Sequence, residues 1–156
     1  MDSFTVSFFG HRKVCNVLHI EAAIEKNVKK LLSEKPYVVF LVGRDGEFDI
    51  LVASVIRRLK REYRSDNSAL MWILPYPTSD YHNNEMEYRS YYDEIEICEG
   101  CYYKSAHRIR NRKMIDRSDL MICYVEHNSG GAYQALRYAQ EIGKKVVNLA
   151  KEMDAL

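Results

Sequence analysis

Four short segments have residue types suited to binding an anion, and three of them combine glycine with charged or polar side chains. The first is Gly10-His11-Arg12. Its glycine permits a tight turn, and a guanidinium can form paired hydrogen bonds with a phosphate. A solvated basic turn without a ligand is the alternative. We take Gly10, His11 and Arg12 as candidate ligand-binding residues.

The second segment, residues 43–49, carries two glycines and two acids ahead of an apolar stretch. Either Glu47 or Asp49 can cap the helix that is expected to follow. A carboxylate here can also hold ribose hydroxyls or act as a general base. Glu47 and Asp49 are therefore the candidate catalytic residues. The candidate ligand-binding residues of this segment are Gly43, Arg44 and Gly46.

The third segment is the basic run at residues 108–113, which contains Arg110 and Asn111. Cations this close together repel one another, so a solvated helix face explains the run as well as a binding role does. The fourth segment is a Ser-Gly-Gly turn before a predicted helix, where N–H groups and the helix dipole attract anions. Its candidate ligand-binding residues are Ser129, Gly130, Gly131, Ala132 and Tyr133.

Other patterns of catalytic or metal-binding residues are missing. The sequence has neither a Walker loop nor a G-x-G-x-x-G after its first apolar run, which counts against an NTPase and an NAD dehydrogenase. Cys98 and Cys101 form one C-x-x-C, but a structural zinc site needs a second ligand pair. We therefore predict no metal and no cofactor, and we expect free thiols in a reducing compartment.

The elements that position these segments follow from apolar runs. Strands are predicted at residues 4–9, 37–42, 69–74, 119–125 and 145–150. Most runs are continuous, which is typical of parallel strands covered on both faces. A shorter alternating run at residues 94–98 predicts an edge strand. Residues 75–84 are expected to be irregular, as in a lid or a ligand-contacting loop.

Helical spacing of apolar residues fills the gaps between these strands. It predicts helices around residues 20–32, 51–59 and 132–142, and a weaker one at 105–117. The alternation predicts an α/β fold: a single Rossmann-like domain over residues 1–156, with a doubly wound, mainly parallel sheet of five to six strands and helices on both faces. Ligands bind at the carboxyl ends of such strands, so the four segments are expected to form one pocket.

The composition sets further expectations. The 156 residues are 47% apolar and 29% charged, as in ordinary globular domains, and the formal net charge is +1. A chain this close to neutral has no overall field that attracts nucleic acid, so we predict that nucleic acid is an unlikely partner. Without a signal peptide or a long apolar run, the protein is expected to be cytoplasmic and to make no membrane contact.

Taken together, the four segments resemble the SLOG superfamily, a Rossmann-like group related to the Lonely Guy and DprA proteins, and specifically its YpsA-like branch. The resemblance covers nearly the whole chain and rests on residues 8–12, 43–49, 110–119 and 129–132 in this order. It implies a pocket for a nucleotide or a nucleotide-derived molecule. The pocket residues that it implies are Gly10, Arg12, Asp49, Arg110, Asn111, Gly130 and Gly131.

One departure from the family bears on catalysis. The Lonely Guy enzymes carry a catalytic glutamate after the Gly-Gly turn, whereas Ala132 and Tyr133 follow it here, and the next turn offers no acid. The leading hypothesis is therefore a sensor or sequestering protein for a nucleotide or a nucleotide-derived small molecule, of which a signal derived from NAD or ADP-ribose is one example, acting as a homo-oligomer. A hydrolase of N-glycosidic or phosphoribosyl bonds, with Glu47 or Asp49 as base and Arg12 and Arg110 on phosphate, is one alternative. A ligand-free interaction module is the other.

Overall fold

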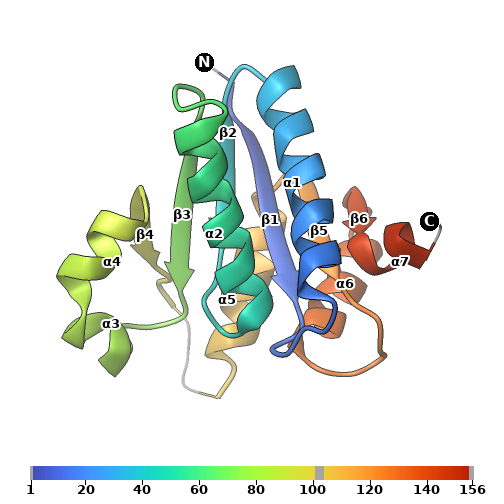
Figure 1. The fold of residues 1–156 in the computed structure, drawn as a ribbon. Helices are drawn as coiled ribbons and strands as arrows, with labels where there is room; N and C mark the ends of the chain where they lie inside the picture. The colour runs from blue at the N-terminus through green and yellow to red at the C-terminus, as the bar shows by residue number, and fades with distance from the viewer. Residues whose placement is uncertain (1, 101–103, 155–156) are drawn as a thin grey trace.

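The computed structural model of the chain describes residues 2–100 and 104–154. Within them, six strands form one sheet in the order β4-β3-β2-β1-β5-β6, and every neighbouring pair is parallel (Figure 1). The strands are β1 (Phe4–Gly10), β2 (Val38–Val42), β3 (Ser68–Leu74), β4 (Glu94–Ile97), β5 (Leu120–Tyr124) and β6 (Val146–Asn148). The predicted Rossmann-like α/β fold is confirmed, and β4 is an edge strand as predicted.

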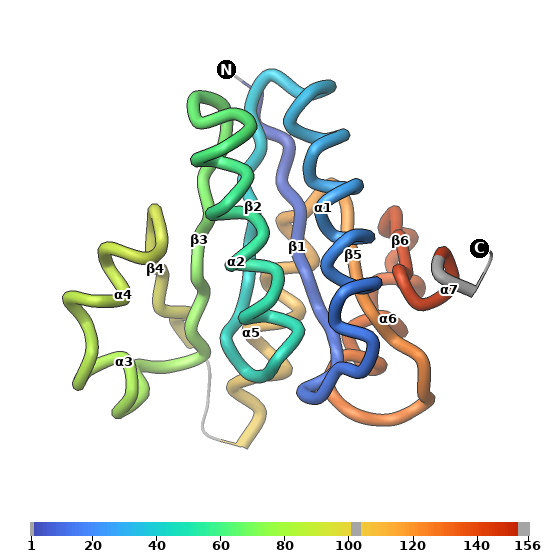
Figure 2. The backbone as a smooth tube through the Cα atoms, viewed as in Figure 1, coloured from blue at the N-terminus to red at the C-terminus, as the bar shows by residue number. Residues whose placement is uncertain are grey.

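Helices cover both faces of this sheet. Helices α1 (Val17–Glu34) and α2 (Glu47–Glu62) lie on one face, and α5 (Ala106–Asp116) and α6 (Gly131–Glu141) lie on the other (Figure 2). Alternation along β1 supplies both cores, because Phe8 packs into the cluster under α1 and α2 while Phe9 joins the cluster under α5 and α6. The sheet is therefore buried on both sides, which explains the continuous apolar runs.

The last strand is shorter than predicted. Residues 145–150 were expected to be one strand, but β6 ends at Asn148 and helix α7 (Leu149–Asp154) follows at once. The Asn148 carboxamide explains the break, because its Oδ1 accepts hydrogen bonds from the backbone N–H groups of Ala150 and Val125. This side chain caps the helix and fixes it to the end of β5.

The segment expected to be irregular is helical. Residues 75–84 contain helix α3 (Ser79–Asn83), and α4 (Glu85–Tyr91) follows. Thr78 Oγ1 accepts a hydrogen bond from Tyr81 N at 3.1 Å and so caps α3. Tyr81 and Tyr88 pack edge-on against Trp72 of β3, with ring centroids 5.8 and 4.8 Å away. Long-range aromatic packing thus orders this segment, in spite of the two prolines that precede α3.

No helix in the described part of the chain is long and apolar enough to cross a bilayer. The thiols of Cys15 and Cys123 are free, as expected, whereas Cys98 is disulfide-bonded, contrary to the expectation. Cys101, the other cysteine of the C-x-x-C, lies outside the described residues.

Candidate functional site

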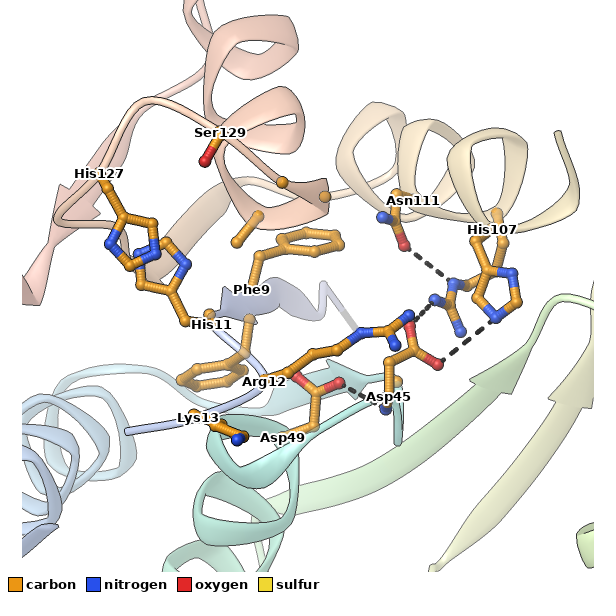
Figure 3. A pocket seen from close by; sticks show the side chains of 17 residues that line it. Phe9, His11, Arg12, Lys13, Asp45, Asp49, His107, Asn111, His127 and Ser129 are labelled. Atoms are coloured by element: carbon orange, nitrogen blue, oxygen red, sulfur yellow. Dashed lines mark hydrogen bonds and ion pairs between the residues drawn. The ribbon is translucent and has the colours of Figure 1, made fainter. Parts of the chain in front are cut away.

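Three glycine-containing segments follow the carboxyl ends of β1, β2 and β5 and, together with the basic run on α5 (Ala106–Asp116), line a cavity of about 420 Å³ (Figure 3). This volume is in the range of small-molecule sites. Most of the candidate residues line it: Gly10, His11, Arg12, Gly43, Asp49, Arg110, Asn111, Ser129, Gly130, Gly131 and Ala132. We call this space the central cavity. Its position is the one expected for ligands of open parallel sheets.

One side of the central cavity has the features of an anion site. Gly130, with φ of 93°, turns the chain into α6, and a Cβ added at Gly130 or Gly131 would meet no atom within 4 Å. The first N–H groups of a helix have no partner within it, so a phosphate can approach them closely. Arg12 also lines the cavity and forms no ion pair with any residue that the structure describes.

The backbone of Arg12 is held by the start of α2. Glu47 N donates to Arg12 O at 2.8 Å, and Glu47 Oε2 accepts from Val14 N at 2.8 Å. A Cβ at Gly46 would lie 2.4 Å from Arg12 Cα, so only glycine allows this approach. Neither Gly46 nor Glu47 lines the central cavity. The predicted catalytic base Glu47 thus lies outside the described lining of the central cavity, and its carboxylate is bound to the loop after β1.

Arg110 is buried in the cavity wall with a relative exposure of 1%. Its Nη1 donates to Ile73 O at 3.0 Å, its Nε to Asn111 Oδ1 at 2.9 Å, and its Nη2 to the carboxylate of Asp45. These contacts use all three nitrogens of the guanidinium. They favour a role in positioning Asp45 and Asn111 over the predicted role of holding phosphate.

Asp49 is the buried acid of the central cavity, with a relative exposure of 9%. Its Oδ2 accepts a hydrogen bond from Asp45 N at 3.0 Å and so fixes the turn before α2. Burial raises the pKa of Asp49 to about 7, although the bond from Asp45 N opposes this rise. A carboxyl group with such a pKa can exchange a proton near neutral pH.

Two stacked imidazoles lie at the opposite end of the cavity from His107 (Figure 3). The His11 and His127 ring centroids are 3.7 Å apart and the planes are inclined by 13°. Nε2 of His11 accepts a hydrogen bond from Glu126 N at 3.0 Å, which requires a neutral ring with its proton on Nδ1. Burial and then the neighbouring His127 lower the pKa of His11, which favours this neutral form.

The cavity also contains residues that the sequence analysis did not select: Phe8, Phe9, Lys13, Asp45, His107 and His127. Asp45 ion-pairs with Arg110, and its Oδ1 lies 3.7 Å from Nε2 of His107. Because Asp45 lies in the second segment, between two candidate ligand-binding glycines, its position in the sequence could have identified it as a site residue. His107 lies three residues before Arg110 on α5, a spacing that puts both on one helix face.

Several predicted site residues lie elsewhere. Arg44 turns away to donate to the Tyr92 hydroxyl at 3.0 Å, and its guanidinium lies 4.9 Å from the centroid of the Tyr88 ring. Tyr133 lines a neighbouring groove instead of the central cavity. The segment expected to be a lid is also absent from the described cavity lining, because α3 and α4 pack on Trp72. Among the described residues, no group of three or more metal-ligating side chains is clustered.

No protein-family model and no curated protein sequence matches the chain. Two solved structures resemble it in fold. DNA processing protein A from Helicobacter pylori, described for its single-stranded DNA binding mode, has a TM-score of 0.64 at 15% identity, over 97% of this chain and 72% of that one. DNA processing protein A (DprA) from Streptococcus pneumoniae has a TM-score of 0.56 at 12% identity, over 97% of this chain and 61% of that one.

At these identities the likeness shows a shared fold. It confirms the Rossmann-like fold that the predicted resemblance implies, shared with DprA proteins, and it gives no support to the YpsA-like branch. The prediction that nucleic acid is an unlikely partner is wrong, because one protein of this fold has a described single-stranded DNA binding mode. That prediction used the net charge of the whole chain, which does not report how charge is distributed over the surface.

Proposed function

We propose that the protein binds a phosphorylated nucleotide in the central cavity. The observation that carries this proposal is the pairing of an open glycine turn at the start of α6 with the unpaired cation Arg12. The glycine turn and Arg12 line the same cavity, whose wall also carries the carboxylates of Asp45 and Asp49 and the side-chain amide of Asn111. A nucleotide presents the matching groups, an anionic phosphate joined to a sugar with hydroxyls.

In this arrangement the phosphate lies at Gly130 and Gly131, within reach of Arg12. Backbone N–H groups and the positive end of the helix dipole stabilise an anion there, and the guanidinium adds charged hydrogen bonds. Figure 3 shows this turn and Arg12 facing the same space.

The sugar and base lie toward Asp45, Asn111 and His107. Arg110 holds Asn111 through its Oδ1, which leaves the Asn111 amide N–H groups free to donate to a ligand. Arg110 also holds Oδ2 of Asp45, and Oδ1, which lies 3.7 Å from His107 Nε2, can accept from ribose hydroxyls as acids do in dinucleotide-binding folds. A polar wall that is oriented before the ligand arrives lowers the entropic cost of binding.

We further propose that the protein belongs to the YpsA-like branch, that it acts as a sensor or sequestering protein, and that it works in the cytoplasm as a homo-oligomer. An NAD- or ADP-ribose-derived signal is the small molecule we favour. The first turn of α6 supports binding over cleavage, because Gly131-Ala132-Tyr133-Gln134 offers no carboxylate.

Hydrolysis of the nucleotide is a second candidate, favoured by one observation. Asp49 lines the central cavity, and burial raises its pKa to about 7. In its ionised form Asp49 can take a proton from a water whose oxygen bonds to the anomeric carbon, while the C–N bond breaks and its electron pair leaves with the base. Of the two candidate catalytic acids, Glu47 and Asp49, only Asp49 is among the residues described as lining this cavity.

Calorimetry and mass spectrometry on the same samples test the proposal and separate the two candidates. The panel is the nucleoside monophosphates, NAD, ADP-ribose and cyclic ADP-ribose isomers, with nucleosides as controls that lack phosphate. A binder retains an unchanged ligand, and a monophosphate binds more tightly than its nucleoside. Release of a free base that Asp49→Asn abolishes would establish the hydrolase. The proposal fails if no panel member binds, or if phosphate adds nothing to affinity.

A further inference from the structure

A second cavity, of about 500 Å³, lies between α5 and α6. We call it the α5–α6 groove. It adjoins the central cavity, because His107, Asn111 and Gly131 line both spaces. Gly131 belongs to the proposed phosphate site, and Asn111 belongs to the proposed sugar site. A substituent on the sugar of a bound nucleotide can therefore extend into the groove.

The charges that line the groove differ from those of the central cavity. Asp45 and Asp49 line the central cavity, whereas the only acid in the described lining of the groove is Glu141. The cations in the described lining of the groove are Lys104, Arg108, Arg112 and Arg137. An anionic substituent on the sugar is thus repelled by Asp45 and attracted toward the groove.

The groove cations are available to an external anion. None of the four forms an ion pair with a residue that the structure describes, whereas nearby Arg117 pairs with Glu96 at 2.6 Å. Because unpaired cations in one groove repel each other, a bound anion stabilises the groove. A solvated helix face accounts for the cations of α5 but not for Arg137, which lines the groove from α6.

Two tyrosines of α6 hold two of the arginines in place. The Arg112 guanidinium carbon lies 4.6 Å from the centroid of the Tyr138 ring, a cation–π distance. Arg137 Nη1 donates to the Tyr133 hydroxyl at 3.0 Å. Because these contacts limit the side-chain freedom of both arginines before a ligand arrives, they lower the entropic cost of binding an anion between them.

The helical spacing on α5 places the groove cations beside the proposed sugar site. His107 and Asn111 are four residues apart, so they share a helix face, and both extend toward the central cavity (Figure 3). Arg108 and Arg112 each follow one residue later, which turns them by about 100° around the helix axis and into the groove. A sugar that contacts Asn111 therefore has these two arginines next to it.

We propose that the α5–α6 groove binds a second phosphate group, carried on a ribose hydroxyl of the small molecule in the central cavity. In dinucleotide-binding folds, a nearby arginine likewise accommodates the ribose phosphate of NADP. Guanidinium groups suit a terminal phosphate, because they form paired hydrogen bonds with its oxygens. This inference rests on the proposed function and narrows its ligand class to a nucleotide derivative with phosphates at two separate positions.

Calorimetry with adenine nucleotides, in a buffer without phosphate, tests the groove. AMP carries one phosphate, whereas adenosine 2′,5′-bisphosphate and adenosine 3′,5′-bisphosphate carry a second one on a ribose hydroxyl. We expect the native protein to bind one of the two bisphosphates about tenfold or more tightly than AMP, the gain from one charged hydrogen-bonded contact. The bisphosphate that binds more tightly identifies the ribose hydroxyl that faces the groove.

Variants on both walls of the groove show where the second phosphate binds. In Arg108→Ala/Arg112→Ala the advantage of the bisphosphate over AMP is lost, and in Arg137→Ala it is reduced, whereas AMP affinity is unchanged in both. The matched control is Lys26→Ala/Lys30→Ala, which removes two exposed cations at the same spacing on α1, on the other face of the sheet. The control retains both affinities, and thermal unfolding verifies that each variant is folded.

The failure of the groove inference is distinguishable from that of the proposed function. If AMP binds and neither bisphosphate binds more tightly, the groove inference fails and the proposed function stands. The same conclusion follows if the folded double variant keeps the bisphosphate advantage, because the second phosphate then lies elsewhere. An equal loss in the control variant also overturns the groove inference, since binding then depends only on total charge. If neither AMP nor a bisphosphate binds, both fail.

Discussion

Arg110 donates from Nη2 to the carboxylate of Asp45, a contact that joins α5 to the loop between β2 and α2. The two residues are 65 positions apart in sequence. Since Arg110 also bonds to Ile73 O at the end of β3, one side chain connects three parts of the cavity wall. The geometry of the site thus depends on a cation that we do not expect to touch the ligand's phosphate.

Arg110→Met should destabilise the fold. The substitution leaves the Asp45 carboxylate and the Ile73 carbonyl without their buried donor, and removing one partner of such a pair costs about 3 kcal/mol after allowance for the partial exposure of Asp45. Thermal unfolding should show Tm lowered by roughly 6–12 °C. Arg108→Met, an exposed cation on the same helix, is the control and should change Tm little. A stable Arg110→Met protein would contradict the positioning role.

Asp49→Asn should stabilise the protein increasingly as pH rises. The folded-state pKa of Asp49, about 7, lies above the ordinary value of 3.8. The folded state therefore binds this proton more tightly, so native stability declines as pH rises from about 4 to about 7. The asparagine variant does not lose stability in this way. Its free energy of unfolding should therefore exceed that of the native protein by an amount on the order of 4 kcal/mol above pH 7.

Denaturant unfolding at several pH values between 4.5 and 8 measures this difference. Asp66→Asn is the control, because Arg64 lowers the pKa of that exposed carboxyl and its effect has the opposite sign. A difference between Asp49→Asn and the native protein that stays constant with pH would show that Asp49 titrates normally.

His11 should titrate below its ordinary pKa of 6.5, because burial and the stacked His127 both disfavour its charged form. Since the folded pKa is lowered, the stability that His11 contributes is present above pH 6.5 and is lost as pH falls below it. NMR of the imidazole nitrogens should show hydrogen on Nδ1 at neutral pH. His127→Ala should raise the His11 pKa only in part, because burial remains; no change at all would mean that the rings do not interact.

Gly131→Ala should separate folding from binding. A Cβ at this position meets no protein atom within 4 Å, so thermal stability is expected to stay nearly unchanged. The methyl group would instead occupy space that the proposal gives to the phosphate, and affinity for AMP should fall at least tenfold. Affinity for adenosine should not fall. Equal AMP binding by the variant would place the phosphate elsewhere.

Much of the fold could be predicted from local patterns. The central strands are continuous apolar runs because helices bury both faces of the sheet, and both ends of the five strands β1 to β5 could be placed within one residue. Helices α3 and α4 could not be predicted, since packing on Trp72 orders them and this contact does not follow from neighbouring residues. The end of β6 could not be predicted either. The apolar residues continue from β6 into α7, whereas the Asn148 side chain caps the helix and ends the strand.

The site could be predicted in its loops but not in the roles of its side chains. Glycine turns at strand ends identify the cavity because topology brings those ends together. The burial of Arg110 could not be foreseen, since arginine is rarely buried without partners, and its partners Asp45 and Ile73 are distant in sequence. Tyr133 is on the groove side of α6 because neighbouring alanines face the sheet.

The most direct measurement of nucleotide binding in the central cavity is a calorimetric comparison of AMP and adenosine, in the native protein and in Arg12→Ala. Arg12 is exposed and unpaired within the described residues, so its removal should leave the fold intact. The account predicts that the native protein binds AMP more tightly than adenosine and that Arg12→Ala lowers AMP affinity by about 10- to 100-fold, the loss of one charged hydrogen-bonding group. Adenosine affinity should be unchanged. Equal affinities for AMP and adenosine in the native protein, or an unaltered AMP affinity in the folded variant, would contradict the account.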